Sequence, residues 1–300
     1  MSLLVLSEHV REALAAGEPV VALETTLVSH GFPRGEGADV ARTCERHVRD
    51  AGAVPATVGI VDGAVRVGLS DEELERFAAD PGARKVGPRD IAAAASQRAL
   101  GATTVGGTLA IARAAGIRFM GTGGIGGVHR GFARTLDVSA DLGELARTEA
   151  LVVASGAKSI LDVPATAEVL ETLGVPVLGW RTDELPLFYL ADGGPSVSAR
   201  VESAAEAAEV ARLHWELGRG GLVLARPPDE SLDVEPLIEK GVAEAERRGV
   251  GGQALTPFLL SFLHERSGGR TVEVNKRLIA ANAELAAEVA VAATAVERGA

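Results

Sequence analysis

Short runs of apolar and β-branched residues alternate along the chain with longer segments whose apolar residues recur every three or four positions. The short runs predict strands and the longer segments predict amphipathic helices. We expect strands at residues 19–23, 56–61, 64–67, 103–105, 117–120, 151–154, 176–180 and 221–224. We expect helices at residues 8–16, 37–51, 71–79, 89–100, 107–115, 140–148, 160–173, 200–217, 235–248, 256–265 and 272–297. This alternation predicts an α/β protein built from βα units around a largely parallel sheet.

Local signals refine this picture. Asp62-Gly63 lies between two short apolar runs and predicts a tight antiparallel hairpin, so the sheet should be mixed. Ser70 and Ser139 each precede acidic residues and predict helix starts. The best linker candidate is the segment 227–230, but the remainder of the chain is short and mostly helical in pattern. We therefore expect a single domain over residues 1–300 with a helical C-terminal layer.

Composition and charge narrow the classes of partner. The chain has 300 residues with a net charge of -11, so it should repel a nucleic-acid polymer, although a local group of amides and lysines can still bind a small phosphorylated ligand. Aromatic residues make up only 3%, which disfavours a base-stacking platform. The single cysteine, Cys44, excludes an intramolecular disulfide. With no signal peptide and no apolar run long enough to span a membrane, we expect a cytoplasmic protein with no membrane partner.

Lys158 is the most informative residue. It lies in the segment 155–162, directly after the apolar run 151–154, where a buried strand should end and a helix begin. Burial and a nearby cation both disfavour the ammonium form of a lysine, and a neutral amine attacks sugar aldehydes and imines. The same position suits a lysine that caps a turn or binds an anion at a helix N-terminus, and spacing alone favours that second interpretation.

Polar residues also follow other predicted strands, where ligands bind in open α/β sheets. Glu24 ends an apolar run, and burial there would raise its pKa toward general acid/base use; a salt bridge or a cap is the competing interpretation. Lys85 lies in the segment 84–90 before an alanine-rich helix, where cations oppose the helix dipole. A bound phosphate and simple solvation explain that segment equally well.

Two glycine-rich segments follow strands as well. In residues 101–107, paired glycines would let backbone amides approach a ligand, although a tight turn also explains them. Residues 121–131 contain G-x-G-x-x-G, but their second half has no helical period, so we reject a dinucleotide site and predict a loop. Its His129 is a candidate for contacting substrate, although a loop histidine is more often simply solvated.

Asp137 and Asp141 close this region. Carboxylates of this kind suit a hard divalent cation with waters completing its shell, although a helix N-terminus also collects acidic residues. The chain has neither an H-E-x-x-H nor a C-x-x-C motif, so zinc is unsupported.

Together these segments resemble the pseudouridine-5'-phosphate glycosidase family, also called the indigoidine synthase A-like family. The similarity continues from Thr256 to the final helix, and the matching stretches are residues 22–31, 85–86 with 89–90, 101–105, 121–131, 137–142 and 155–162. The resemblance implies a three-layer α/β/α fold, a homotrimer and a manganese-dependent enzyme with glycosidase and lyase character. Its reaction would reversibly cleave the C–C glycosidic bond of pseudouridine 5'-phosphate to ribose 5-phosphate and uracil, in pseudouridine catabolism.

The same resemblance assigns roles to residues. Lys158 is expected to be the nucleophile, Glu24 the proton donor and Asp137 the ligand of one Mn²⁺ per subunit. The expected substrate contacts are Lys85, Val105, Ser139, Ala140, Asp141, His129 and Asn275. Where the family has paired asparagines, this chain has Ala281-Asn282, which leaves the contact there unassigned.

This chemistry explains why a lysine is needed. Direct displacement from a C-glycoside would expel a carbanion at C5 of uracil, whereas addition of an amine to the ring-opened sugar divides the reaction into easier steps. Two alternatives remain open from the sequence. One is a Schiff-base aldolase or lyase acting on a phosphorylated sugar, and the other is a protein that only binds a nucleotide or sugar phosphate.

Overall fold

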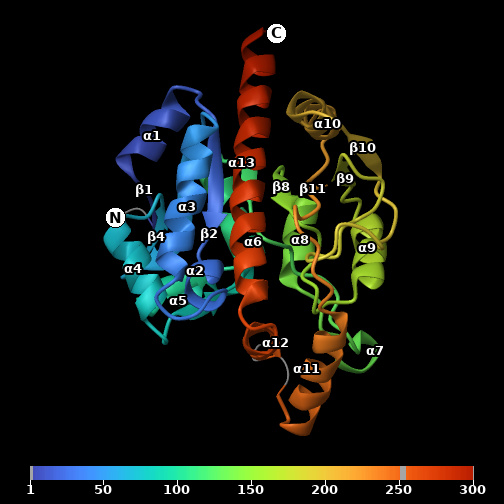
Figure 1. The fold of residues 1–300 in the computed structure, drawn as a ribbon. Helices are drawn as coiled ribbons and strands as arrows, with labels where there is room; N and C mark the ends of the chain where they lie inside the picture. The colour runs from blue at the N-terminus through green and yellow to red at the C-terminus, as the bar shows by residue number, and fades with distance from the viewer. Residues whose placement is uncertain (1–2, 251–254, 300) are drawn as a thin grey trace.

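The computed structural model describes residues 3–250 and 255–299, in which helices cover both faces of a sheet (Figure 1). The strands run in the spatial order β1-β4-β3-β2-β7-β8-β11-β9-β10, and β6 joins β3 to β5. Of the strand pairs in the described residues, only β3–β4 and β3–β6 are antiparallel, which confirms a mixed, largely parallel sheet. The strands are β1 Leu4–Leu6, β2 Val20–Glu24, β3 Val54–Val61, β4 Ala64–Val67, β5 Arg84–Val86, β6 Gly101–Thr103, β7 Phe119–Gly121, β8 Leu151–Ala154, β9 Val177–Trp180, β10 Ala199–Val201 and β11 Leu222–Ala225.

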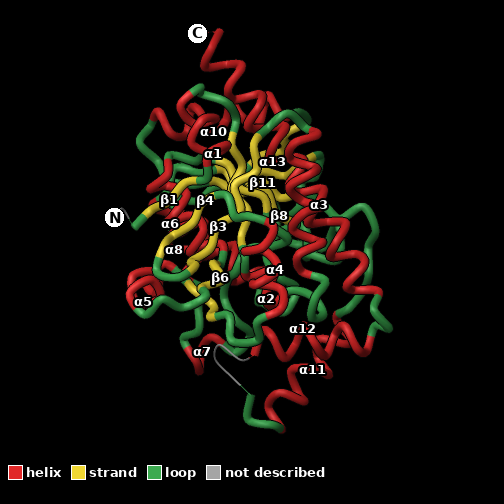
Figure 2. The backbone as a smooth tube through the Cα atoms, turned by 90° about the vertical axis from the view of Figure 1, so that its left-hand side faces the viewer, coloured by secondary structure: helices red, strands yellow, loops and turns green. Residues whose placement is uncertain are grey.

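The helices form two layers, which confirms the α/β/α architecture. On one face α13 packs against α3, α10 and the central strands, while α6 and α8 pack together on the other face (Figure 2). The helices are α1 Glu8–Ala15, α2 Thr26–His30, α3 Gly37–Asp50, α4 Asp71–Ala79, α5 Ile91–Ser96, α6 Val105–Ala115, α7 Phe132–Thr135, α8 Ala140–Arg147, α9 Val163–Thr172, α10 Ala204–Glu216, α11 Glu235–Arg247, α12 Leu255–Arg266 and α13 Arg270–Gly299, with the 3₁₀ turn η1 Pro88–Asp90 before α5.

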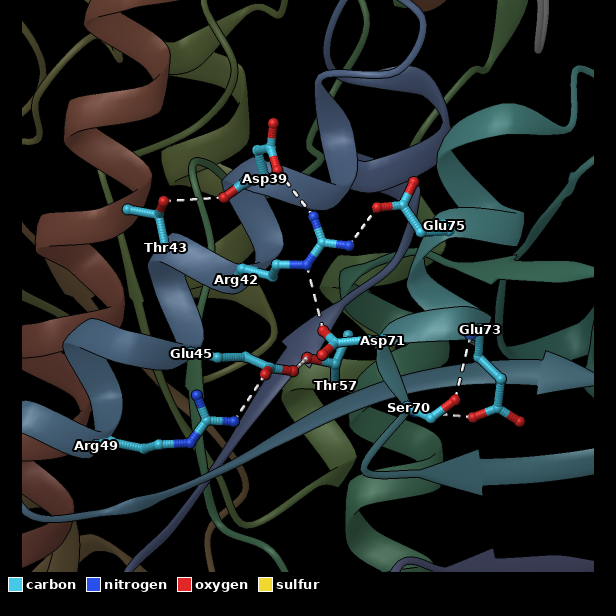
Figure 3. A network of polar contacts seen from close by, with 10 residues as sticks. All are labelled: Asp39, Arg42, Thr43, Glu45, Arg49, Thr57, Ser70, Asp71, Glu73 and Glu75. Atoms are coloured by element: carbon cyan, nitrogen blue, oxygen red, sulfur yellow. Dashed lines mark hydrogen bonds and ion pairs between the residues drawn. The ribbon is translucent and has the colours of Figure 1, made fainter.

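The hairpin and helix-start predictions are confirmed. Asp62 and Gly63 connect β3 to β4 with φ values of 53° and 90°. Both values are positive because a two-residue hairpin of this type needs left-handed backbone at both positions. Ser70 and Glu73 form a reciprocal capping box at the start of α4, with distances of 3.2 and 3.0 Å (Figure 3). Ser139 caps α8 by accepting a hydrogen bond from the amide of Asp141.

Several predicted boundaries are wrong for identifiable reasons. The strand expected at residues 103–105 is β6, which ends at Thr103 because Thr104 already caps α6. The helix expected from residue 160 begins at Val163, since Asp162 is its cap and Pro164 belongs in a first turn. The helix expected from residue 200 begins at Ala204, because residues 199–201 pair with β9. The helix expected at 89–100 is divided between η1 and the short α5.

Helix α13 corrects another expectation. Residues 270–296 are long and apolar enough to cross a membrane, although we expected no such segment. Half of its most apolar stretch is buried inside the protein, and α13 contacts β2, β7 and β8 directly. Its apolar residues therefore serve the core, and small side chains such as Ala283, Ala286 and Ala287 let it lie close to the sheet.

Candidate active site

The candidate site lies where three neighbouring parallel strands end. Strand β2 ends at Glu24, β7 at Gly121 and β8 at Ala154, and β7 pairs with both of the other strands. Because parallel strands present their carboxyl ends at one edge of a sheet, the segments that follow them converge there. Two of these segments are central to the site: residues 122–131, the glycine loop, and residues 155–162, the lysine loop.

The glycine loop and the lysine loop continue the pairing of β7 and β8 beyond the strands. The amide of Ser155 donates to the carbonyl of Gly123 at 2.9 Å, and the amide of Ile125 donates to the carbonyl of Gly156 at 3.1 Å. The backbone amide of Lys158 then donates to the carbonyl of Ile125 at 3.1 Å. Hydrogen bonds of the backbone therefore hold Lys158 in a loop, outside any helix. The prediction that a helix begins at this lysine is wrong, because α9 begins only at Val163.

Glu24 is buried beside this loop pair, with 3% of its surface exposed. The hydroxyl of Thr122 donates to Oε1 of Glu24 at 2.5 Å, whereas Oε2 is buried and has no hydrogen-bond partner among the residues that the structure describes. Burial raises the pKa of the Glu24 carboxyl above its ordinary value of 4.5, and the positive charge of Lys158 and the bond from Thr122 oppose that shift. Such a carboxyl can hold a proton and release it to a nearby group, as a general acid must.

Lys85 supplies a second cation. It lies on β5 rather than at a helix start, so the predicted conflict with a helix dipole does not arise. The side chain keeps accessible surface, but the surrounding protein still lowers the pKa of Lys85, and the positive charge of Lys158 lowers it further. The carboxylates of Asp141, Glu24 and Asp137 act in the opposite direction. The structure thus brings both predicted lysines and the three predicted carboxylates into one electrostatic cluster.

Asp141 has a role that the sequence did not reveal. Its carboxylate accepts hydrogen bonds from the amides of Gly106, at 2.8 Å, and Gly126, at 2.9 Å. It thereby joins the first turn of α6, which begins at Val105, to the glycine loop. Any side chain at Gly126 would collide with Ser139 and Asp141. The amide of Gly106, which we expected could face a ligand, is therefore occupied by a protein carboxylate, as is the amide of Gly126.

His129 and Asp137 lie side by side at the rim of the site. Their side chains are 4.0 Å apart, from Nδ1 to Oδ2, and the amide of His129 donates to the carbonyl of Asp137 at 3.0 Å. Burial lowers the pKa of His129, while the charge of Asp137 opposes that shift. Ser139 and Ala140 follow directly at the start of α8.

The donor set near Asp137 limits the kind of metal site. Among the residues that the structure describes, no group of three or more His, Cys, Asp or Glu side chains could hold a metal ion. The carboxylate of Asp137 remains partly accessible, while both oxygens of Asp141 already accept amide hydrogen bonds. These residues fit a hard cation that has one direct protein ligand and an otherwise aqueous shell.

Helix α13 contributes two buried asparagines, of which only Asn275 was expected to contact substrate. Asn275 is 3% exposed and lies close to Gly123, and within the described part of the chain its Oδ1 has no hydrogen-bond partner. Asn282 is fully buried, and its Nδ2 donates to the carbonyl of Thr122 at 2.8 Å and to the hydroxyl of Ser155 at 3.1 Å. Both asparagines lie on the buried apolar stripe of α13, seven positions apart, and an amide on such a stripe is the signal that could have identified Asn282.

Known proteins resemble this chain over nearly its whole length. Residues 9–292 match the family described as indigoidine synthase A like protein. A Salinispora tropica protein named pseudouridine-5'-phosphate glycosidase is 51% identical over 96% of this chain and 91% of its own length. A protein of the same name from Herpetosiphon aurantiacus is 49% identical over 97% of this chain and 98% of its own length.

Two solved structures share the whole fold. The prealnumycin C-glycosynthase AlnA, solved in complex with ribulose 5-phosphate, is 42% identical and superposes with a TM-score of 0.92 over 100% of both chains. The indigoidine synthase A-like protein of Thermotoga maritima is 38% identical, with a TM-score of 0.87 over 97% of both chains. The expected resemblance is confirmed: this chain belongs to the indigoidine synthase A-like family and is an enzyme of that family.

Proposed function

We propose that this enzyme reversibly cleaves the C–C glycosidic bond of pseudouridine 5'-phosphate, giving ribose 5-phosphate and uracil. Relatives that are about half identical over nearly the full length carry the name of that activity. The observation that carries the proposal is the pairing of the glycine and lysine loops, which holds Lys158 within electrostatic reach of the buried carboxyl of Glu24. A nucleophile and a proton donor are the two groups that this reaction needs.

The reaction begins with opening of the sugar ring. Protonated Glu24 gives its proton to the ring oxygen as the bond from that oxygen to C1 of the sugar breaks, and electrons from the uracil ring form a double bond to C1. The amine of Lys158 then adds to C1, which returns the electron pair to the uracil ring. Glu24 is left ionised and takes the proton that the nitrogen loses.

Cleavage follows from the adduct. A proton from Glu24 is delivered to C5 of uracil while the bond between C1 and C5 breaks, and the nitrogen lone pair forms the C=N bond of an imine. Water hydrolyses this imine to release ribose 5-phosphate and restore the amine. Each step therefore uses a leaving group that is better than a bare carbanion.

The remaining predicted residues bind and orient the substrate. Lys85 offers its charge to the phosphate, and a second cation beside Lys158 opposes full protonation of both amines. Asp137 would anchor the expected Mn²⁺, which when bound orders water and the phosphate. Substrate contacts from residues 139–141, Val105, His129 and Asn275 belong to the same proposal. So do a cytoplasmic homotrimer, a role in pseudouridine catabolism and the organisation as one domain.

Two measurements test the proposed function. Borohydride should trap an adduct of ribose 5-phosphate on Lys158. If no adduct is trapped, the protein only binds its ligand and does not act through a lysine imine. Incubation with ribose 5-phosphate, uracil and Mn²⁺ should yield pseudouridine 5'-phosphate by mass spectrometry. A trapped adduct with no such product would instead favour the Schiff-base lyase.

A further inference from the structure

The residue Phe188 combines two unusual features. Its φ is 66°, although a bulky aromatic residue rarely adopts the left-handed region, and its side chain is 5% exposed. It lies in the long connection between β9 and β10. A strained residue of this kind persists only when the surrounding structure fixes it, and such residues are common near functional sites.

The ring of Phe188 rests on the glycine loop. A Cβ atom at Gly124 would lie 2.7 Å from Cδ2 and 2.8 Å from Cε2 of Phe188, and 3.2 Å from the carbonyl oxygen of Gly156. The ring therefore fills space that a side chain at position 124 would take, next to a peptide of the lysine loop. Phe188 touches the glycine loop directly, and its contact is close to where the two loops pair.

The connection that carries Phe188 is tied to the lysine loop. Leu187 forms an antiparallel bridge with Gly156, whose own φ is 78° and whose missing Cβ would lie 2.1 Å from the carbonyl oxygen of Pro186. The next residue toward the nucleophile is Ala157, which pairs with Ile125. Phe188 thus lies one residue from the bridge that leads to Lys158.

The rest of the fold holds the ring in this place. The ring of Tyr189 packs edge-on against Phe188 with centroids 4.7 Å apart, and Tyr189 is fully buried. The amide of Tyr189 donates to the carbonyl of Leu187 at 2.8 Å, and its own carbonyl accepts from the amide of Leu232 at 2.7 Å. These contacts of Tyr189 fix the backbone of the strained turn and support the ring of Phe188 beside Gly124.

We propose that Phe188 is a positioning residue, whose ring sets the spacing of the glycine and lysine loops and so places the amine of Lys158 relative to Glu24. This inference rests on the proposed function. The ring acts through Gly124 and Gly156 rather than on the substrate. A displacement of about 1 Å between a nucleophile and its target is enough to slow a reaction roughly 100-fold.

The test compares Phe188→Leu with Phe77→Leu. Phe77 of α4 is also fully buried and also packs on a glycine, because a Cβ at Gly59 would lie 2.7 Å from its Cζ. Both variants should unfold at a lower temperature. Phe188→Leu should reduce kcat for pseudouridine 5'-phosphate roughly 10- to 100-fold with KM changed less than about threefold, while Phe77→Leu should keep the wild-type kcat. Equal kcat values for the two variants would overturn the proposal.

A second variant separates the ring from the strain. Phe188→Gly removes the ring and also the steric strain of the left-handed backbone, which glycine adopts freely. Its loss of stability should therefore be smaller than the loss expected from removing the ring alone. The loss of kcat should nevertheless persist, because nothing replaces the contact with Gly124. Recovery of wild-type kcat in Phe188→Gly would show that the ring positions nothing.

Amide hydrogen exchange gives a readout that does not depend on turnover. The amides of residues 122–131 and 155–162 should exchange faster in Phe188→Leu than in the wild type. In Phe77→Leu, the exchange rates of the same amides should equal those of the wild type. Unaltered exchange in Phe188→Leu would refute the positioning role. A wild-type protein that neither traps ribose 5-phosphate nor forms product would refute the proposed function separately, while the exchange comparison would still decide what Phe188 holds.

Discussion

Glu45 and Glu24 are buried to a similar degree, with 8% and 3% of their surfaces exposed, but their oxygens are satisfied differently. Oε1 of Glu45 accepts from the hydroxyl of Thr57 at 2.7 Å, and Oε2 accepts from Arg49 at 2.8 Å (Figure 3). Glu24 has one short hydrogen bond from Thr122, and its other oxygen has no partner in residues 3–250 and 255–299. A buried carboxylate with all its partners holds a fold together, whereas one that lacks partners remains available for a substrate.

The same contrast extends to the surrounding cations. In the surface network on α3 and α4, the single cation Arg42 pairs with three carboxylates, those of Asp39, Asp71 and Glu75 (Figure 3). At the candidate site, Lys85 and Lys158 repel each other, and partial desolvation by the surrounding protein lowers the pKa of Lys85 although its side chain keeps accessible surface. The ion pairs of the surface network lower the free energy of the folded state. At the site, the two lysines repel each other, and a negatively charged substrate can reduce that repulsion.

Lys158→Ala should break this comparison most completely. Without the amine no covalent adduct forms, so turnover should fall by more than about 1,000-fold. The fold should remain, because the lysine is only half-buried and its backbone bonds do not depend on its side chain. Activity assays and thermal unfolding of the same preparation check both points, and a variant that turns over near the wild-type rate would exclude Lys158 as the nucleophile.

Glu24→Gln and its matched control Glu45→Gln should differ in what they lose: the first should lose activity and the second stability. Glu24→Gln should lose about 100- to 10,000-fold in kcat because the proton donor is gone. Glu45→Gln should keep its activity and lose about 1 to 3 kcal/mol of stability, since the bond from Arg49 loses its charged acceptor. A stable Glu45→Gln protein without activity would contradict this assignment of roles.

The dependence of stability on pH gives a further test of the difference between Glu24 and Glu45. Because its pKa is raised in the folded protein, the folded state binds the proton more tightly than the unfolded state does. The stability that this proton contributes is complete below pH 4.5 and is lost as the pH rises through the folded-state pKa. Glu24→Gln should therefore unfold at a higher temperature than wild type at neutral pH, with a smaller difference at pH 4.5.

Asp137→Ala should affect the metal more than the fold. Its carboxylate is partly accessible, and the bond between the backbones of His129 and Asp137 does not need it. We expect the Mn²⁺ concentration for half-maximal activity to rise by about 10-fold or more, with the unfolding temperature nearly unchanged. A large loss of thermal stability in metal-free protein would instead assign Asp137 a structural role.

Arg42→Ala should give the smallest effect. Its three acidic partners are exposed, and exposed ion pairs are typically worth less than about 1 kcal/mol each because water and salt screen them. Activity should be unchanged, and the small loss of stability should shrink further in high salt. Urea unfolding at two salt concentrations measures this, and a loss of activity would connect the surface network to the site.

The central strands were predictable because each is a continuous apolar run. Strand β8 has the predicted bounds, and β2 differs by one residue at each end. The three-residue strands β1, β5 and β10 were missed, because a segment such as Arg84–Val86 contains no periodic pattern and becomes a strand only through its partner β6. Tertiary pairing decided these short elements, and local sequence could not.

Within the site, residue types were more predictable than their bonds. Glu24, Lys85 and Lys158 could be selected because each interrupts or follows a run that should be buried. That Asp141 binds the amides of two glycines, or that Asn282 reaches Thr122, depends on helices and loops far apart in sequence. Phe188 has no sequence signal at all, because its left-handed backbone is imposed by its neighbours.

The position of α13 in the chain has a consequence for synthesis. On a ribosome, the segments bearing Glu24, Lys85 and Lys158 emerge well before α13, yet Asn275 and Asn282 reach the glycine loop only when that helix arrives. Chains fold as they emerge, so the nascent protein passes through a stage at which the amine exists without its finished surroundings. Because α13 is synthesised after every other described element, a partly made chain should hold an inert lysine, and reactive chemistry should begin only once translation has passed this helix.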